Sequence, residues 1–75
     1  MVEDFLKIVA KLLNVNVSTL TLQSDRDALQ QWDSLAHLRL IAQIEETYLV
    51  EFPIEKIMNI KSLNDIYQYI MDNKK

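Results

Sequence analysis

The sequence predicts an all-α fold of three main helices and one short helix, with a long loop between the first two helices. Apolar residues recur at the three- and four-residue spacing of amphipathic helices in segments that begin near Val2, Ser34 and Leu63. Glycine is absent and proline occurs once, so the chain has few residues that interrupt a helix. At 75 residues the chain has the length of one small domain, and we expect one domain over residues 1–75.

The first helix is predicted to run from Val2 to the neighbourhood of Asn14 or Asn16. Glu3 and Asp4 occupy its first turn, where the positive end of the helix dipole favours acidic side chains. In the absence of glycine, asparagine is the residue best able to take the left-handed conformation that ends many helices. The predicted apolar face consists of Val2, Phe5, Leu6, Val9, Leu12 and Leu13.

The second helix is predicted over residues 34–48 and has two apolar stripes rather than one. The face expected to be buried contains His37, Leu40, Ile41, Ile44 and Tyr48. A surface helix needs only one apolar stripe to join a core, so the other one predicts a surface that binds a partner. That second stripe consists of Leu35, Leu38, Ala42 and Leu49.

Residues 15–33 are expected to form a connection that is packed down on the fold rather than free. Trp32, at its end, is expected to be a core residue at the base of the second helix. Two alternatives stay open for this segment: a short strand pair, or single helical turns capped by Ser18 and by Ser24 with Asp25. The residues expected to hold the connection down are Val17, Leu20, Leu22 and Leu29.

The C-terminal third predicts a short helix and then a final long one. Pro53 suits the first position of the short helix, whose apolar edge is Ile54, Ile57 and Met58, and Phe52 before it is expected to point into the core. Ser62 and Asp65 resemble a capping box for the last helix, with Asn59 as the alternative cap. The core face of the last helix is predicted from Leu63, Ile66, Tyr67, Ile70 and Met71.

Charge and composition argue against several classes of function. The formal net charge is −3 and the pI about 4.9, which opposes binding to nucleic acid. The chain has no cysteine and one histidine, so we expect neither a disulfide framework nor a metal site. No apolar run approaches the roughly 18 residues that span a bilayer, and we expect a cytoplasmic monomer with no membrane span.

The sequence Asp33-Ser34-Leu35, placed before an amphipathic helix in a small acidic chain, resembles the attachment motif of acyl carrier proteins. The resemblance covers nearly the whole chain. It includes Phe5-Leu6-Lys7-Ile8-Val9 in the first helix, Glu45-Glu46 with Tyr48, Glu51-Phe52-Pro53, and Leu63, Ile66 and Ile70 in the last helix.

The resemblance implies a phosphoprotein that carries a 4′-phosphopantetheine arm, derived from coenzyme A, on Ser34. In the family the terminal thiol of that arm holds an acyl group as a thioester, and the carrier itself is not a catalyst. The implied partners are a phosphopantetheinyl transferase and acyl-activating, acyl-transferring or condensing enzymes. Asp33 and Leu35 complete the motif, and Asp33 is implied to serve recognition by the transferase or metal binding within it.

Three other interpretations of Ser34 stay open. A serine before an apolar-periodic run can simply cap the helix, because its hydroxyl accepts a bond from a free backbone N–H. His37 lies three residues later, so Ser34 and His37 can be considered as the nucleophile and base of a small hydrolase. The predicted position of His37 on the buried face favours a structural histidine instead. Finally, the chain can be an unmodified helical docking module that binds a partner helix.

The partner surface is predicted on the outer side of the second helix and on the neighbouring edge of the short one. The best-known fatty-acid carriers are strongly acidic after the serine, whereas this chain has Ala36, His37 and Arg39 there. We therefore expect a specialised pathway, such as polyketide, peptide, lipid-modification or surface-polysaccharide synthesis, with an aminoacyl or peptidyl cargo as the alternative. Arg39 can instead pair with Glu46 or Gln43. The predicted partner residues are Leu35, Ala36, Leu38, Arg39, Ala42, Glu45, Glu46 and Ile57.

Overall fold

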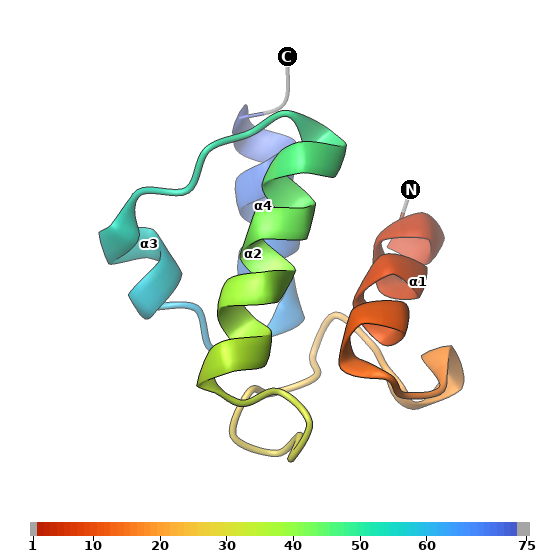
Figure 1. Ribbon diagram of the computed structural model, residues 1–75. Coiled ribbons are helices and arrows are strands. Elements are labelled where there is room, and N and C mark those ends of the chain that lie inside the picture. Colours follow the sequence, from red (N-terminus) through yellow and green to blue (C-terminus); the bar gives the residue numbers. More distant parts are fainter. Residues whose placement is uncertain (1, 74–75) are drawn as a thin grey trace.

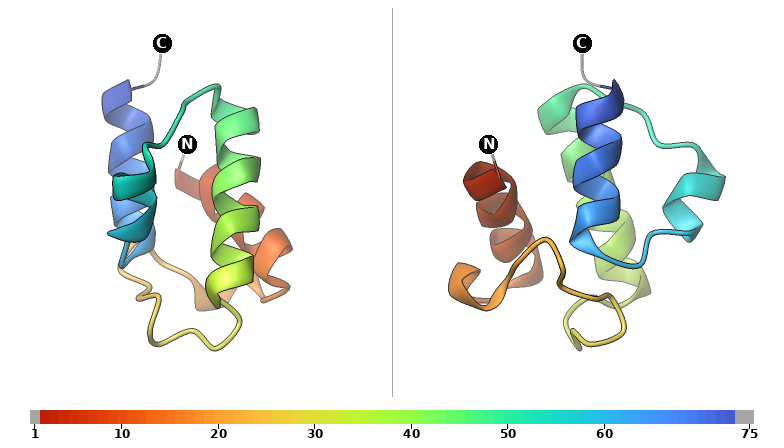
Figure 2. Two further views of the ribbon diagram at one scale, coloured as in Figure 1. Left: turned by 60° about the vertical axis from the view of Figure 1, so that its left-hand side comes forward. Right: turned by 180° about the vertical axis from the view of Figure 1, so that it is seen from behind.

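The computed structural model describes residues 2–73, which form four α-helices and one short 3-10 helix (Figure 1). Helices α2 and α4 lie side by side and run in the same direction, α1 runs in the opposite direction, and α3 lies on the side away from α1 (Figures 1 and 2). The predicted all-α fold, with one short helix and a long first loop, is confirmed. The elements are α1 Val2–Leu13, η1 Val17–Thr19, α2 Ser34–Tyr48, α3 Ile54–Met58 and α4 Leu63–Asn73.

The three long helices close one apolar core. On the predicted inner face of α2, His37, Leu40, Ile41 and Ile44 are buried as expected. Tyr48, the last residue of that face, is partly buried against the core. Trp32 is 2% exposed and joins this core from the loop, as expected. Complete burial of one large aliphatic or aromatic side chain stabilises a fold by about 1.5–3 kcal/mol, so the core is the main source of stability. The core side chains with no exposed surface are Phe5, Val9, Leu40, Ile44, Leu63 and Ile66.

The helix ends show which local predictions hold. Asn14 follows α1 with a φ of 58°, so an asparagine does take the left-handed position. The capping box of α4 is also confirmed, because Ser62 N donates to Asp65 Oδ2 at 3.2 Å and Asp65 N donates to Ser62 Oγ at 3.4 Å. Pro53, expected as the first residue of the short helix, instead precedes it as the N-cap.

The loop between α1 and α2 crosses the end of the bundle at which α2 and α4 begin (Figure 1). Backbone hydrogen bonds fix it there: Arg26 N donates to the Lys61 carbonyl at 2.7 Å, and Leu63 N donates to the Ser24 carbonyl at 3.1 Å. The second bond pairs Leu63 N, a donor at the start of α4 that the helix itself cannot pair, and the first pairs the N–H of Arg26 in the loop. The loop is therefore attached to the fold by its backbone as well as by apolar side chains.

Details of this loop differ from the expectations. In place of a strand pair, the described part of the chain has an isolated bridge between Asp25 and Ser62. The helical turn Val17–Thr19 is capped by Asn16, whose Oδ1 accepts from Ser18 N at 2.9 Å, and not by Ser18 itself. The expectation that Val17 packs inward is wrong, because this turn leaves its side chain 39% exposed. Leu20 is buried, and Leu22 and Leu29 pack against the core.

Candidate functional site

The start of α2 is capped by Asp33 and not by Ser34. Asp33 has an extended backbone, and its Oδ1 accepts a hydrogen bond from Ala36 N at 2.8 Å. The Asp33 carbonyl accepts from His37 N at 2.8 Å and so begins the helical hydrogen-bond ladder. Ser34 is the first residue inside the helix. The interpretation of Ser34 as the cap is therefore wrong, because the preceding carboxylate already fills that role.

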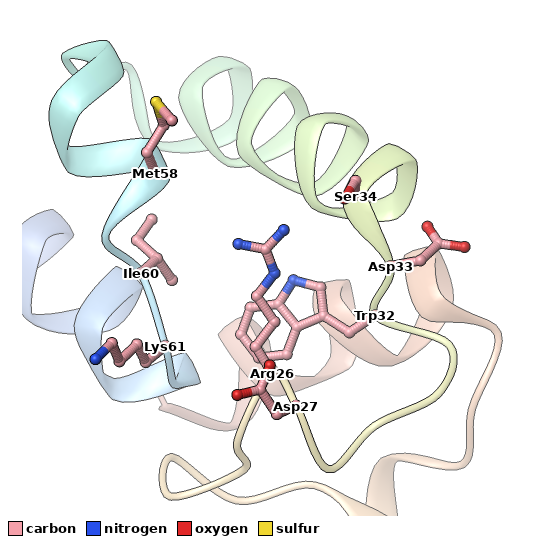
Figure 3. Close-up of a pocket in the computed structure, with 8 residues that line it drawn as sticks. All are labelled: Arg26, Asp27, Trp32, Asp33, Ser34, Met58, Ile60 and Lys61. Atoms are coloured by element: carbon pink, nitrogen blue, oxygen red, sulfur yellow. The ribbon is translucent and has the colours of Figure 1, made fainter.

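Ser34 is exposed and lines two neighbouring hollows in the surface. The first, called here the basic hollow, has a volume of about 430 Å³ and lies between the loop, the start of α2 and the segment that leads into α4 (Figure 3). Its lining residues are Arg26, Asp27, Trp32, Asp33, Ser34, Met58, Ile60 and Lys61.

The second, called the helix hollow, lies between α2 and α3 and has a volume of about 220 Å³. Ser34, His37 and Leu38 line it from α2, and Ile57 and Met58 line it from α3; Arg26 completes it. Ile57, which was predicted on the apolar edge of the short helix, thus lines the same hollow as Ser34. Ile54, on the same predicted edge, is 73% exposed.

His37 is buried at 3% exposure and has a hydrogen-bond partner on each ring nitrogen. Trp32 Nε1 donates to His37 Nδ1 at 2.9 Å, and His37 Nε2 lies 2.8 Å from the Ile57 carbonyl oxygen. An indole N–H can only donate and a carbonyl oxygen can only accept, so the imidazole is neutral with its proton on Nε2. His37 therefore connects the loop, α2 and α3 through one ring.

The surroundings of His37 also decide its protonation. Burial lowers the pKa of His37 below its ordinary value of 6.5; the hydrogen bond to Ile57 opposes this shift, and the charge of Arg26 adds to it. With both ring nitrogens engaged by Trp32 and Ile57, the imidazole has no lone pair directed at the Ser34 hydroxyl. The arrangement does not form the serine–histidine dyad of a hydrolase.

The predicted partner surface divides into exposed and internally engaged residues. Leu35 and Leu38 are each 59% exposed, which is high for large apolar side chains. Ala42, Arg39 and Glu46 are also exposed, whereas Ala36, Glu45 and Ile57 are partly buried. The exposed apolar strip of α2 agrees with the second stripe predicted from the sequence, and its role in binding partners stays a prediction.

Glu45 has an internal contact that the sequence did not indicate. Its Oε2 accepts a hydrogen bond from Phe52 N at 2.8 Å, which ties the end of α2 to the segment before α3. Phe52 is itself buried and stacks on Tyr69 with ring centroids 4.4 Å apart. Glu45 therefore helps to position α3 whether or not it also contacts a partner.

Four residues that line the basic hollow were not predicted from the sequence, namely Arg26, Asp27, Ile60 and Lys61. Arg26 and Lys61 are brought together by the backbone bond between the loop and the start of α4. A contact between residues this distant in the chain leaves no local pattern in the sequence. Met58, placed on the edge of α3 by its spacing, proves to line both hollows beside Ser34.

The first turn of α2 is a favourable place for an anionic group such as a phosphate ester. Residues 2–73 contain no group of three or more His, Asp or Glu side chains that could hold a metal ion. None of the helices in this range has both the length and the apolar character needed to cross a bilayer. An exposed hydroxyl in the first turn of α2 lies where free N–H groups and the helix dipole favour an anion.

Comparison with known proteins identifies relatives over almost the full chain. A family model described as "Phosphopantetheine attachment site" matches residues 3–70. The chain is 35% identical over 72 residues to the "Acyl carrier protein" of Helicobacter pylori (strain G27), and the match covers 96% of this chain and 92% of that protein. It is 33% identical over 72 residues to the same-named protein of Helicobacter acinonychis (strain Sheeba), with equal coverage. The "Acyl carrier protein" of Onion yellows phytoplasma (strain OY-M) is 30% identical over 71 residues, 95% of this chain and 93% of that protein.

Proposed function

Because this chain belongs to the acyl carrier protein family, whose prosthetic group is a covalently attached 4′-phosphopantetheine, we propose that Ser34 is the residue that carries the group. The group supplies a terminal thiol on a flexible arm, and that thiol holds acyl cargo as a thioester. The protein then serves as a carrier between enzymes of a biosynthetic pathway and does not itself catalyse. Tethering raises the effective concentration of the cargo at each enzyme.

The observation that carries this proposal is the placement of Ser34. The Asp33 side chain caps α2, so Ser34 is not needed as the cap and its exposed hydroxyl lies in the first turn. Esterification there replaces no capping hydrogen bond. The chain's own contribution is to present this oxygen at a fixed place at the start of a long helix, with open hollows beside it for the first atoms of the arm.

The residues after Ser34 support a pathway other than bulk fatty-acid synthesis. Ala36 and Arg39 provide no negative charge there, and His37 is buried and neutral. A partner enzyme that expects an acidic helix would meet an apolar strip with one cation, and a like-charge contact suppresses binding. We propose partners that recognise the exposed apolar side chains of Leu35 and Leu38, among them the transferase that installs the arm.

Intact-mass measurement tests the assignment of Ser34. With coenzyme A and a phosphopantetheinyl transferase, the mass of the wild-type chain should rise by one phosphopantetheinyl group. Ser34→Ala should abolish the increase, yet melt at the temperature of the wild type, because Asp33 still caps the helix. Ser18→Ala, a change at another exposed serine, is the matched control and should accept the arm normally.

The proposal is wrong if the wild-type chain stays unmodified with several unrelated transferases, or if Ser34→Ala still gains the full mass. Purification from the native host and weighing of the intact chain would also identify the cargo, since acyl and aminoacyl groups differ in mass.

A further inference from the structure

We infer that Arg26 binds the phosphodiester of the arm on Ser34 and holds its first atoms in the basic hollow. The inference rests on the proposed attachment at Ser34 and adds a specific anion-binding residue from the long loop. It is carried by the position and surroundings of Arg26.

Three residues line both hollows of the site: Ser34, Met58 and Arg26. Figure 3 shows the guanidinium of Arg26 directed into the space between Met58 and Ser34, while the ammonium of Lys61 points away from that space. The charge of Arg26 also reaches His37, one turn along α2, where it lowers the pKa of the imidazole. The positive charge therefore acts at the first turn of α2, beside the attachment oxygen.

The backbone under Arg26 is held in place, which favours binding. Arg26 N donates to the Lys61 carbonyl at 2.7 Å, and the adjacent Asp25 forms a bridge with Ser62. Asp25 Oδ1 also accepts from Asp27 N at 2.8 Å, which fixes the turn that follows. The side chain is partly buried, so less conformational freedom is lost when its guanidinium meets an anion than for a mobile surface arginine.

The acidic neighbours leave the guanidinium available to a phosphate. The carboxylate of Asp33 points away from the basic hollow and is engaged by Ala36 N at 2.8 Å (Figure 3). The carboxylate of Asp27 lies at the other end of the Arg26 side chain from the guanidinium (Figure 3). A planar guanidinium can donate two parallel hydrogen bonds to phosphate oxygens, which a lysine cannot do.

The test compares the melting temperature before and after attachment of the arm, in the wild type and in Arg26→Gln. At low salt we expect attachment to raise Tm by about 2–5 °C in the wild type, the size expected of one partly exposed ion pair in a domain this small. Arg26→Gln should lose at least half of that rise. The rise in the wild type should also shrink as salt is added, because screening weakens an exposed pair.

Arg39→Gln is the matched control, because it removes the other arginine of the chain, which lines a hollow on the side of α1. Lys61→Gln removes the second cation of the basic hollow, whose ammonium points away from Ser34. Both should keep the full rise in Tm. Arg26→Lys should keep part of it, because the charge remains and the planar fork is lost.

Intact mass separates failure of this inference from failure of the proposed function. If every variant accepts the arm but attachment raises the Tm of Arg26→Gln as much as that of the wild type, the role of Arg26 is wrong and the assignment of Ser34 stands. If the wild type accepts no arm on Ser34, both are wrong. If Arg26→Gln fails to fold, the NMR resonance of the Arg26 Nε–H group in the wild type provides the test. This resonance should shift when the arm is attached to Ser34, and an unchanged resonance overturns the inference.

Discussion

At the scale of single residues, His37 is the best-connected side chain near the site. Its ring receives a hydrogen bond from Trp32 and reaches the carbonyl of Ile57, so one neutral imidazole joins the loop, α2 and α3. A proton on Nδ1 would remove the acceptor that Trp32 needs. The neutral form is thus part of the folded structure, and stability must depend on pH.

The free energy of unfolding should decrease as the pH falls through 6.5. Burial lowers the pKa of His37 below 6.5, so the unfolded chain binds the proton more readily than the folded one. The contribution of neutral His37 to the free energy of unfolding is complete above pH 6.5 and is lost progressively below it. The loss stops once the pH is below the pKa of His37 in the folded protein. Urea unfolding between pH 8 and pH 5 measures it, and His37→Gln should lack this part of the slope. An equal slope in both proteins would contradict the prediction.

The residue scale also shows why sequence alone gave an incomplete account of the site. The periodicity of α2 placed His37 on the buried face, because a helix repeats every 3.6 residues and the neighbours of His37 are apolar. Its two partners come from a loop and from another helix, whose approach no local pattern specifies. Asp33 and Ser34 are both good capping residues, and only the backbone geometry shows which of them caps.

At the scale of the elements, the two left-handed helix ends differ in how well their sequences suit them. Asn14 ends α1 with a φ of 58°, and asparagine tolerates that conformation. Leu49 ends α2 with a φ of 55° although leucine does not favour it, and its side chain is 83% exposed. Nothing in the sequence marked Leu49 as such a position, because the backbone there is set by the return of the chain toward α3. Its N–H donates to the Glu45 carbonyl.

Leu49→Gly should therefore stabilise the protein. The left-handed conformation destabilises the folded state by about 1–2 kcal/mol for a residue with a Cβ, and glycine removes this cost. Glycine also has more conformational freedom in the unfolded chain, which offsets about 0.5–1 kcal/mol of the gain. We expect a net rise of about 0.5–1 kcal/mol in the free energy of unfolding, measured by urea titration.

Ala42→Gly is the control within the same helix, and it should lower the free energy of unfolding by about 1 kcal/mol because its position is regular helix. Loss of stability in both variants would show that Leu49 contributes contacts that outweigh its backbone strain.

The long loop shows the other limit of prediction from sequence. The general expectation, a connection packed on the fold by Leu20, Leu22 and Leu29, is confirmed. Its attachment to α4 depends on backbone bonds such as Arg26 N to the Lys61 carbonyl, and every residue but proline carries those groups. The sequence therefore indicates that the loop packs, but not where it packs.

At the scale of the whole molecule, exposed apolar side chains gather near the start of α2 and along α3. Leu35 and Leu38 are each 59% exposed, and Ile54 and Met58 are 73% and 74% exposed. Such residues add nothing to the core, and neighbouring exposed apolar side chains commonly mark a surface for another protein. The core and these exposed apolar side chains are thus separate, and a mutation can alter one without the other.

Leu38→Glu should leave the free energy of unfolding within about 0.5 kcal/mol of the wild type, since the side chain is exposed. It should lower kcat/KM for attachment of the arm about tenfold, which corresponds to roughly 1.4 kcal/mol of lost contact with the transferase.

Gln43→Glu places the same charge on the side of α2 that faces α1, outside the predicted partner surface, and should leave kcat/KM unchanged. Steady-state attachment rates and urea unfolding of both variants make the comparison. If Leu38→Glu accepts the arm as fast as the wild type does, the transferase does not bind to this face of α2.

Trp32 is the only tryptophan of the chain, and it lines the hollow beside Ser34 while its indole N–H is bonded to His37. The protein consequently contains its own fluorescent reporter. Emission from this single indole will respond when the imidazole gains a proton and when an ester is formed nearby, so that both events can be followed in real time without any added dye.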